Sequence, residues 1–208
     1  ARSTLAMPKQ SLRTAMLERR RRISMADRAA WGQAAQSRLL STPEYVAANV
    51  LALYSPVRDE VPTDTIFHAA REAGKRLAYP RVAATGLEFV EVSDLDGMRP
   101  GRFGILEPVG VSLLPLATID LMVIPGVAYD LEGFRLGYGK GCYDRFLHGS
   151  DVKPRRAGFC YELQLTASLP VENHDIAMHL LITESRILRF APQLGEVAAP
   201  GGTPLTTS

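Results

Sequence analysis

The segment IDLMVIPGVAYDLEGFRLGYGKGCYDRFL, from Ile119 to Leu147, joins a short apolar run to a turn-rich stretch full of glycine. The apolar run, Ile119 to Pro125, predicts a buried strand, because a short β-prone run bounded by Pro and Gly is typical of a central parallel strand. Ligands of parallel sheets bind beyond the carboxyl ends of the strands. The sequence therefore predicts that chemistry occurs in the turn-rich stretch.

Glycine alternates with other residues in this stretch, at Gly137, Gly139 and Gly141. Such a backbone can adopt positive φ and bring its N–H groups close to a phosphate. The next residues, 142–147, predict a short helix whose N-terminus faces the same anion, and Arg135 and Lys140 add positive charge. From the residues alone, a flexible turn remains equally open. The spacing matches neither GxxxxGK[ST] nor GxGxxG, so this is not a standard P-loop or Rossmann site.

Helical and strand patterns alternate along the rest of the chain. Helices are expected at 9–22, from a capping box at Ser24 and Asp27 to Leu40, at 63–74 and at 142–147, and a short one is expected to begin at 42–44. Further strands are expected at 49–56, 76–80, 87–92, 155–161 and 179–184. This alternation predicts an α/β fold, a single domain with a largely parallel central sheet flanked by helices.

The chain has 208 residues, of which 46% are hydrophobic, which suits one domain with a substantial core. Residues 1–8 are expected to be an N-terminal extension or processing remnant, and 9–190 the folded domain. Residues 191–208 are rich in Ala, Pro, Gly and Thr, and predict a disordered tail.

The formal net charge is +2 and the pI about 8.6, which suits a small anionic substrate and no nucleic-acid partner. The two cysteines, Cys142 and Cys160, make no disulfide framework, so a reducing compartment is expected. No apolar run is long enough to span a membrane. These features predict a cytoplasmic protein, and a monomer because no amphipathic stretch is left over.

Several segments occur together in a known order: KQSLR (9–13), YSPVRDEVPT (54–63), GRFGILEP (101–108), RLGYGKGCYD (135–144), GFCYELQL (158–165) and LPVENHDIAMHLLITE (169–184). In these segments the chain resembles the 5-formyltetrahydrofolate cyclo-ligase family, also called 5,10-methenyltetrahydrofolate synthetases. The resemblance covers nearly all of Lys9 to Ile187, and RLGYGKGCYD is its most specific part.

The resemblance implies a ligase of one-carbon metabolism that uses ATP and Mg²⁺ to convert 5-formyltetrahydrofolate to 5,10-methenyltetrahydrofolate, ADP and phosphate. It also implies that the formyl oxygen is first phosphorylated. The implied fold is similar to that of sugar-phosphate isomerases and CoA transferases.

The resemblance also implies the roles of particular residues. The ATP site would comprise Lys9, Gln10, Ser11, Leu12, Arg13, Arg135, Leu136, Gly137, Tyr138, Gly139, Lys140, Gly141, Cys142 and Tyr143. Folate would bind at Ser55, Glu60, Tyr138, Gly139, Lys140, Gly141 and Cys142. Catalysis would depend on Lys140, Arg135 and Tyr143, and Mg²⁺ would be bound by Asp144 and Asp175.

The residues alone leave alternatives for some of these positions. Lys9 and Arg13 share a helix face, whereas Arg19 to Arg22 fit a solvated basic face. Glu60 fits a solvated loop acid, Asp144 an acid at a helix N-terminus, and Tyr143 a core aromatic. The chain departs from the family at Cys142, where an aromatic is usual, at Pro62, which replaces a common acid, and at Met178-His179, where a second acid is frequent. His179 is expected to be a partly buried strand-edge residue.

Two other functions fit the sequence. One is an enzyme of the same fold that acts on another phosphorylated or heterocyclic substrate. The other is a non-catalytic nucleotide- or folate-binding regulator that touches nucleic acid through its arginine run, although no basic surface with interleaved aromatics is evident.

Overall fold

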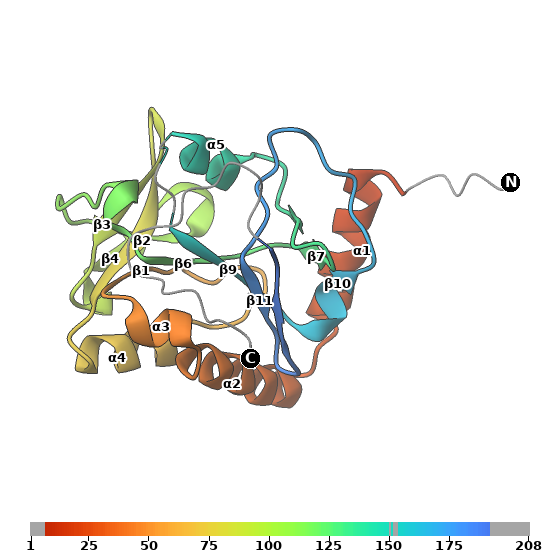
Figure 1. The fold of residues 1–208 in the computed structure, drawn as a ribbon, viewed down its shortest axis with the longest axis horizontal. Helices are drawn as coiled ribbons and strands as arrows, with labels where there is room; N and C mark the ends of the chain where they lie inside the picture. The colour runs from red at the N-terminus through yellow and green to blue at the C-terminus, as the bar shows by residue number, and fades with distance from the viewer. Residues whose placement is uncertain (1–6, 150, 152–153, 192–208) are drawn as a thin grey trace, which may run out of the picture.

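The computed structural model describes residues 7–149, 151 and 154–191, and a seven-stranded sheet forms its centre (Figure 1). Neighbouring parallel strands follow the order β11 (Leu180–Ile182), β9 (Arg155–Phe159), β6 (Leu121–Ile124), β1 (Val50–Ala52) and β2 (Arg76–Ala83). An antiparallel strand borders each side, β12 (Ile187–Arg189) and β3 (Gly86–Glu91). The predicted α/β fold with a largely parallel central sheet is confirmed.

Side chains along the central strands alternate between two buried faces, because successive strand residues point to opposite sides. Along β1, Leu51 and Leu53 pack into one core cluster, whereas Val50 and Ala52 pack into another. A sheet covered on both faces explains why these strands are continuous apolar runs in the sequence.

Helices α2 (Met25–Leu40), α3 (Pro43–Ala47) and α4 (Asp64–Glu72) cover one face of the sheet (Figure 1). The predicted cap begins α2: the hydroxyl of Ser24 accepts a hydrogen bond from the backbone N–H of Asp27 at 3.0 Å. The Thr42 hydroxyl caps α3 in the same way. Helix α5 (Cys142–His148) packs on the other face, against β3.

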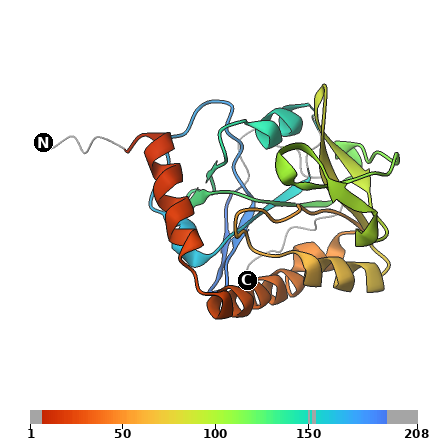
Figure 2. The ribbon, with the colours of Figure 1, turned by 180° about the vertical axis from the view of Figure 1, so that it is seen from behind.

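Helix α1 (Lys9–Arg21) lies across the end of the sheet, and its C-terminal end leads directly into α2 (Figure 2). Its residue Arg20 donates hydrogen bonds to the carbonyls of Arg58 and Gly126, which follow β1 and β6 respectively. The helix therefore lies at the carboxyl ends of the parallel strands, where ligands bind in such sheets.

The structure also contains short elements that the sequence did not predict. Strands β7 (Ala128–Asp130), β8 (Arg135–Leu136) and β10 (Leu165–Thr166) form one small sheet, and β4 (Met98–Pro100) pairs with β5 (Leu106–Pro108). Single 3₁₀ turns are η1 (Leu95–Gly97), η2 (Arg102–Gly104), η3 (Leu116–Thr118) and η4 (Glu162–Gln164). The glycine-rich stretch therefore does not follow β6 directly, because the β7–β8 hairpin comes first.

The predicted extension and tail fall mostly on residues 1–6 and 192–208, which lie outside the described residues. The boundaries at 1–8, 9–190 and 191–208 stay predictions. Within the described ranges, no helix is long and apolar enough to cross a membrane.

Candidate active site

A glycine loop, residues 137–141, leaves β8 and leads into α5. Gly139 (φ 100°) and Gly141 (φ 58°) are in the left-handed region that favours glycine, whereas Gly137 is not. The predicted positive φ is thus confirmed at two of the three positions. Gly141 is the N-cap of α5, so the loop delivers the chain into the helix N-terminus.

Arg13 of α1 lies against this loop. Its Nε donates a hydrogen bond to the carbonyl of Gly137 at 2.8 Å. A Cβ at Gly139 would make an ordinary contact of 3.5 Å with the Arg13 guanidinium carbon, so the positive φ, and not lack of space, favours glycine at this position. The structure brings together the first helix and the glycine loop, the two segments implied for ATP.

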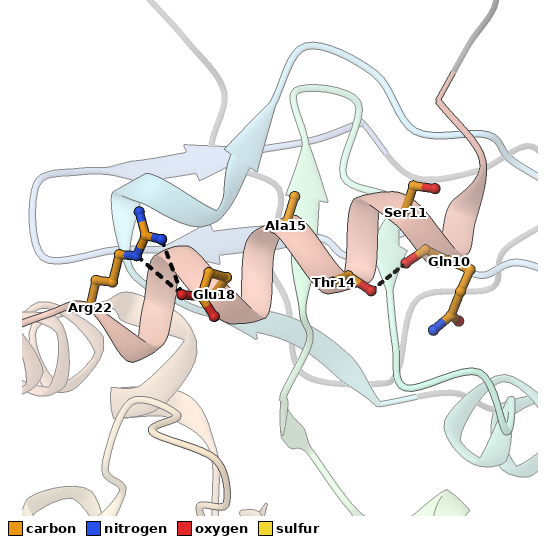
Figure 3. A pocket seen from close by; sticks show the side chains of 6 residues that line it. All are labelled: Gln10, Ser11, Thr14, Ala15, Glu18 and Arg22. Atoms are coloured by element: carbon orange, nitrogen blue, oxygen red, sulfur yellow. Dashed lines mark hydrogen bonds and ion pairs between the residues drawn. The ribbon is translucent and has the colours of Figure 1, made fainter.

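The rest of the KQSLR segment divides between two faces of α1. Leu12 packs against the core cluster that holds Met16 and Leu136. Gln10 and Ser11 lie on the exposed face, which forms a shallow hollow shown in Figure 3 and lined by Gln10, Ser11, Thr14, Ala15, Glu18 and Arg22. The Gln10 amide oxygen accepts a hydrogen bond from Nη1 of Arg13 at 3.4 Å, so Gln10 contacts the arginine that lies against the glycine loop.

Lys9 points into a group of acidic residues. Its ammonium lies 3.3 Å from a carboxylate oxygen of Glu172 and 3.6 Å from one of Asp175. His174 approaches the same Glu172 carboxylate at 3.2 Å. Asp175 is anchored, because its Oδ2 accepts the Glu172 N–H at 2.8 Å. Lys9 and Arg13 share a helix face as predicted, but their charged ends have different partners.

Asp144, in the first turn of α5, links two segments. One carboxylate oxygen accepts from Nη2 of Arg135 at 3.0 Å, and the other accepts from the backbone N–H of Ile176 at 3.2 Å. Asp144 therefore contacts the segment that contains Asp175, but the group of possible ligand atoms that lie within 4.8 Å of one another contains Glu172, His174 and Asp175 and not Asp144. Arg135 is buried, and its guanidinium lies 5.3 Å from the Tyr143 ring centre.

The partly buried Tyr143 ring packs edge-on against Phe89, at 6.4 Å between ring centres, and against the core cluster that contains Phe89. Burial raises the pKa of its hydroxyl well above the usual range. These contacts favour the core-aromatic interpretation of Tyr143, and the hydroxyl stays protonated at neutral pH.

Lys140 lies at the exposed tip of the loop. Its ammonium is 3.1 Å from the ring centre of Phe103, a side chain that is 67% exposed. Phe103 comes from the GRFGILEP segment and has a left-handed backbone, with φ 62°. The sequence did not predict a role for Phe103. Its segment was only one of those in which the chain resembles the cyclo-ligase family.

Glu60 is buried at 6% exposure, so the interpretation as a solvated loop acid is wrong. One carboxylate oxygen accepts the backbone N–H of Val57 at 2.9 Å, and the other accepts the hydroxyl of Tyr138 at 2.9 Å. Burial raises the pKa of Glu60, and the Val57 N–H and the Arg20 guanidinium partly oppose that rise.

Arg20 contradicts the expectation that Arg19 to Arg22 form a solvated basic face, because it is only 1% exposed. Its Nη2 donates to the Tyr138 hydroxyl at 2.6 Å, in addition to the two carbonyls described above. The burial of Arg20 could have been predicted from its position in the helix. Arg13, Met16 and Arg20 recur at helical spacing, and the apolar Met16 marks that face as the one that packs against the protein.

The loop after β1 contains two consecutive residues with left-handed backbones, Arg58 (φ 47°) and Asp59 (φ 65°). Arg28 fixes this turn through an ion pair with Asp59 at 2.6 Å. Left-handed conformations are costly for residues other than glycine and concentrate at functional sites. The turn places Glu60 beneath the glycine loop.

Ser55 lines a cavity of about 320 Å³ beside this turn, together with Pro56, Pro62, Thr63, Asp64, Tyr79, Leu95, Met98 and Leu106. The buried Ser55 hydroxyl has no hydrogen-bond partner among the described residues. The Ser55 hydroxyl is therefore available to form a hydrogen bond with a ligand in this cavity, whose walls are largely apolar.

The departures from the family have ordinary local partners. Pro62 packs on Gly32 of α2, where a Cβ would lie only 2.8 Å from the proline ring. The Cys142 sulfur lies 3.8 Å from a guanidinium nitrogen of Arg145. His179 is half-buried as predicted, and its Nδ1 accepts the backbone N–H of Arg156 at 3.0 Å.

Comparisons with known sequences all relate the chain to the same group of proteins. The sequence model of the 5-formyltetrahydrofolate cyclo-ligase family matches residues 6–184. The 5-formyltetrahydrofolate cyclo-ligase of Escherichia coli (strain K12) is 32% identical over 176 residues, covering 82% of this chain and 97% of that protein. The protein of the same name from Mycolicibacterium smegmatis is 31% identical over 188 residues, covering 86% and 94% respectively.

Solved structures agree with the sequence relatives. The NMR structure of Aquifex aeolicus 5,10-methenyltetrahydrofolate synthetase superposes with a TM-score of 0.80 at 33% identity, covering 97% of both chains. A 5,10-methenyltetrahydrofolate synthetase from Mycoplasma pneumoniae gives 0.72 at 25% identity, covering 86% of this chain and 99% of that one. Since the match extends over nearly the whole folded domain and not only the glycine loop, the chain belongs to the 5-formyltetrahydrofolate cyclo-ligase family.

Proposed function

We propose that this protein is an ATP-dependent 5-formyltetrahydrofolate cyclo-ligase, which forms 5,10-methenyltetrahydrofolate, ADP and phosphate. Family membership supports the reaction. The observation that carries the site assignment is the hydrogen bond from Tyr138, within the glycine loop, to Glu60, beyond strand β1. It supports treating the phosphate loop and the folate-binding acid as one continuous site.

The reaction requires an activated oxygen, because a formamide oxygen cannot leave as hydroxide. In our proposal the formyl oxygen attacks the γ-phosphorus of ATP and ADP departs. The second folate nitrogen, N10, then forms a bond to the formyl carbon and loses its proton, while the C–O bond breaks and phosphate leaves. Such a transfer depends on positioning and charge neutralisation rather than on a covalent protein nucleophile.

The cations of the site suit this task in different ways. The Nε bond to Gly137 holds Arg13 in place, Nη1 donates a long hydrogen bond of 3.4 Å to the Gln10 amide oxygen, and Nη2 would be directed to phosphate oxygens. Lys140 would leave the Phe103 ring to reach the transferred phosphate. Leaving the ring loses an exposed cation–π contact, which is worth about 0.5–1 kcal/mol. Stabilising the charge of the transition state gains about 3 kcal/mol, so the movement of Lys140 from the ring to the phosphate is favourable. Arg135, paired with Asp144, orients that acid.

The acidic residues near α5 fit a magnesium ion. Asp144 and Asp175 offer carboxylate oxygens, the ligand type that Mg²⁺ prefers. Ligating atoms of Glu172, His174 and Asp175 lie within 4.8 Å of one another, which makes Glu172 a further candidate. The Lys9 ammonium beside two of these acids shows that the cluster attracts positive charge. A bound ion would neutralise charge on the nucleotide phosphates.

The proposal includes a monomer that acts on 5-formyltetrahydrofolate with ATP and Mg²⁺ and needs no nucleic-acid partner. Sedimentation of the protein at micromolar concentration would detect any obligate assembly.

Ultraviolet spectroscopy tests the proposed reaction. Protein incubated with 5-formyltetrahydrofolate and Mg-ATP should generate the long-wave absorbance band of a methenyl folate, together with ADP. Omitting ATP should abolish the band. Binding of both substrates without any band would assign the protein to the non-catalytic alternative, and failure to bind folate would favour a same-fold enzyme with another substrate.

Glu60→Gln is expected to weaken folate binding by about 1.5–3 kcal/mol, because one acceptor for a charge-assisted hydrogen bond becomes a donor. The new amide N–H would also face either Val57 N–H or the Tyr138 hydroxyl, both of which need an acceptor. ATP affinity should change little. Calorimetry with each ligand measures the folate and ATP affinities. The matched control is Glu72→Gln, which changes an exposed acid at the end of α4. Equal losses for both ligands would contradict a folate-specific role.

Arg13→Ala is expected to weaken ATP binding by about 1.5–3 kcal/mol, the usual value of hydrogen bonds to a charged partner. Folate binding should stay within a few-fold of the parent. The matched control is Arg21→Ala, which removes an exposed arginine of the same helix. Unchanged ATP affinity in the Arg13 variant would remove this residue from the nucleotide site.

A further inference from the structure

Arg20 connects three segments that meet at the carboxyl edge of the sheet. Its three guanidinium nitrogens donate, at 2.9, 3.2 and 2.6 Å respectively, to the carbonyl of Arg58, the carbonyl of Gly126 and the hydroxyl of Tyr138. The side chain is almost completely buried. A buried guanidinium is stable only when its donors are satisfied, and here each nitrogen has an acceptor.

The direction of the hydrogen bonds through Tyr138 is forced by Arg20. A guanidinium can only donate, so the Tyr138 oxygen must accept from it. The single phenolic proton is then free to point at Glu60, whose Oε1 lies 2.9 Å away. Burial raises the pKa of Tyr138 to about 12, so this proton is retained at neutral pH. The Glu60 carboxylate can only accept, so Arg20 and Glu60 together make the Tyr138 hydroxyl an acceptor from the one and a donor to the other.

We propose that Arg20 is a positioning residue of the folate site: its positive charge keeps the Glu60 carboxylate ionised, and its hydrogen bond to Tyr138 aims that carboxylate for the substrate. This inference rests on the proposed function for its ligand, but the Arg20–Tyr138–Glu60 relay exists in the free protein. If Arg20 had only a structural role, it would hold the three segments together, and its loss would not change the pKa of Glu60.

The charges around Glu60 explain why Arg20 matters. Burial favours the neutral acid, whereas the Arg20 and Arg58 guanidinium groups and two hydrogen bonds favour the carboxylate. The other titratable groups that sense Glu60 are neutral phenols, namely Tyr54, Tyr129, Tyr138 and Tyr143. Arg58 is exposed and lies over the Tyr138 ring at 5.2 Å, so solvent screens it more than Arg20. Loss of Arg20 should therefore raise the pKa of Glu60.

The direct experiment titrates the Glu60 carboxyl by carbon-13 NMR in the protein without ligands, with Glu60→Gln to assign the resonance. Arg20→Met should shift the Glu60 titration to higher pH. Arg20→Lys keeps the charge but loses the three-way geometry, and should titrate near the parent. Arg21→Met, one position away and exposed, should change nothing. An unshifted titration in folded Arg20→Met would overturn the proposal.

Folate affinity, measured by calorimetry across pH, supplies the second readout. Binding should be lost as pH falls through the pKa of Glu60, and in Arg20→Met this loss should occur at higher pH. Arg20→Lys should bind folate roughly tenfold more weakly than the parent, the size expected for losing a well-oriented charged hydrogen bond. Its ATP affinity should change much less.

A double-mutant cycle distinguishes action through Tyr138 from general disruption, and it does not need Arg20→Met to fold. Arg20→Lys should cost folate binding much less in a Tyr138→Phe background than in the parent. Fully additive losses, or equal losses for ATP and folate, would contradict the relay. If the parent itself binds no folate, the proposed function fails, while the carboxyl titration still decides the role of Arg20.

Discussion

Lys140→Ala is expected to lower turnover about a hundredfold, with little change in ATP or folate affinity. A charge that stabilises the transition state is worth about 3 kcal/mol, which corresponds to that factor in rate. Because the Lys140 side chain is exposed and its contact is with the Phe103 ring, its removal should leave the fold intact. Single-turnover kinetics at saturating substrates measure the effect on the chemical step.

Two controls sharpen this prediction. Lys140→Arg keeps a cation at the loop tip and should recover much of the lost rate. Arg145→Ala removes an exposed cation of α5 whose described contact is the Cys142 sulfur, and should cost far less. A Lys140→Ala variant with the parental single-turnover rate would make the glycine loop a structural feature only.

Asp175→Asn should raise the magnesium concentration needed for half-maximal rate. Loss of an outer partner of a metal ligand typically weakens metal binding about 10- to 100-fold, and loss of the ligand Asp175 itself should weaken it more. The amide oxygen can still accept the Glu172 N–H, so the local turn should persist. Asp144→Asn is a less clean test, because it would leave the buried Arg135 without its carboxylate partner. Rates measured across a magnesium titration give the result.

Glu172→Gln tests the further candidate ligand in the same titration. Glu172 is 58% exposed at its side chain, against 17% for Asp175, so its loss should matter less. If Asp175→Asn responds to magnesium like the parent, the acidic cluster does not hold the ion.

The fold was predictable where hydrophobic patterns are long. The strand at 121–124 and the capped helix after Ser24 both occur where expected, because each depends on local burial or local hydrogen bonding. The β7, β8 and β10 strands were missed, since two or three residues cannot show alternation. Their pairing depends on contacts between segments far apart in the sequence.

The site was predictable in composition but not in its connections. Spacing placed Lys9 and Arg13 on one helix face, yet only the folded chain shows Arg13 on the glycine loop and Lys9 among acids. Arg20 was hidden in a run of arginines that favours a solvated face. Its burial follows from the meeting of α1 with the ends of β1 and β6, which no local pattern encodes.

The central claim is that the site activates the formyl oxygen by phosphoryl transfer from ATP. An oxygen-18 tracer tests it most directly: 5-formyltetrahydrofolate labelled in the formyl oxygen is converted with unlabelled Mg-ATP, and the released phosphate is analysed by mass spectrometry. The account predicts one labelled oxygen in each phosphate released during cyclisation. Unlabelled phosphate, with the label released into water, would contradict it.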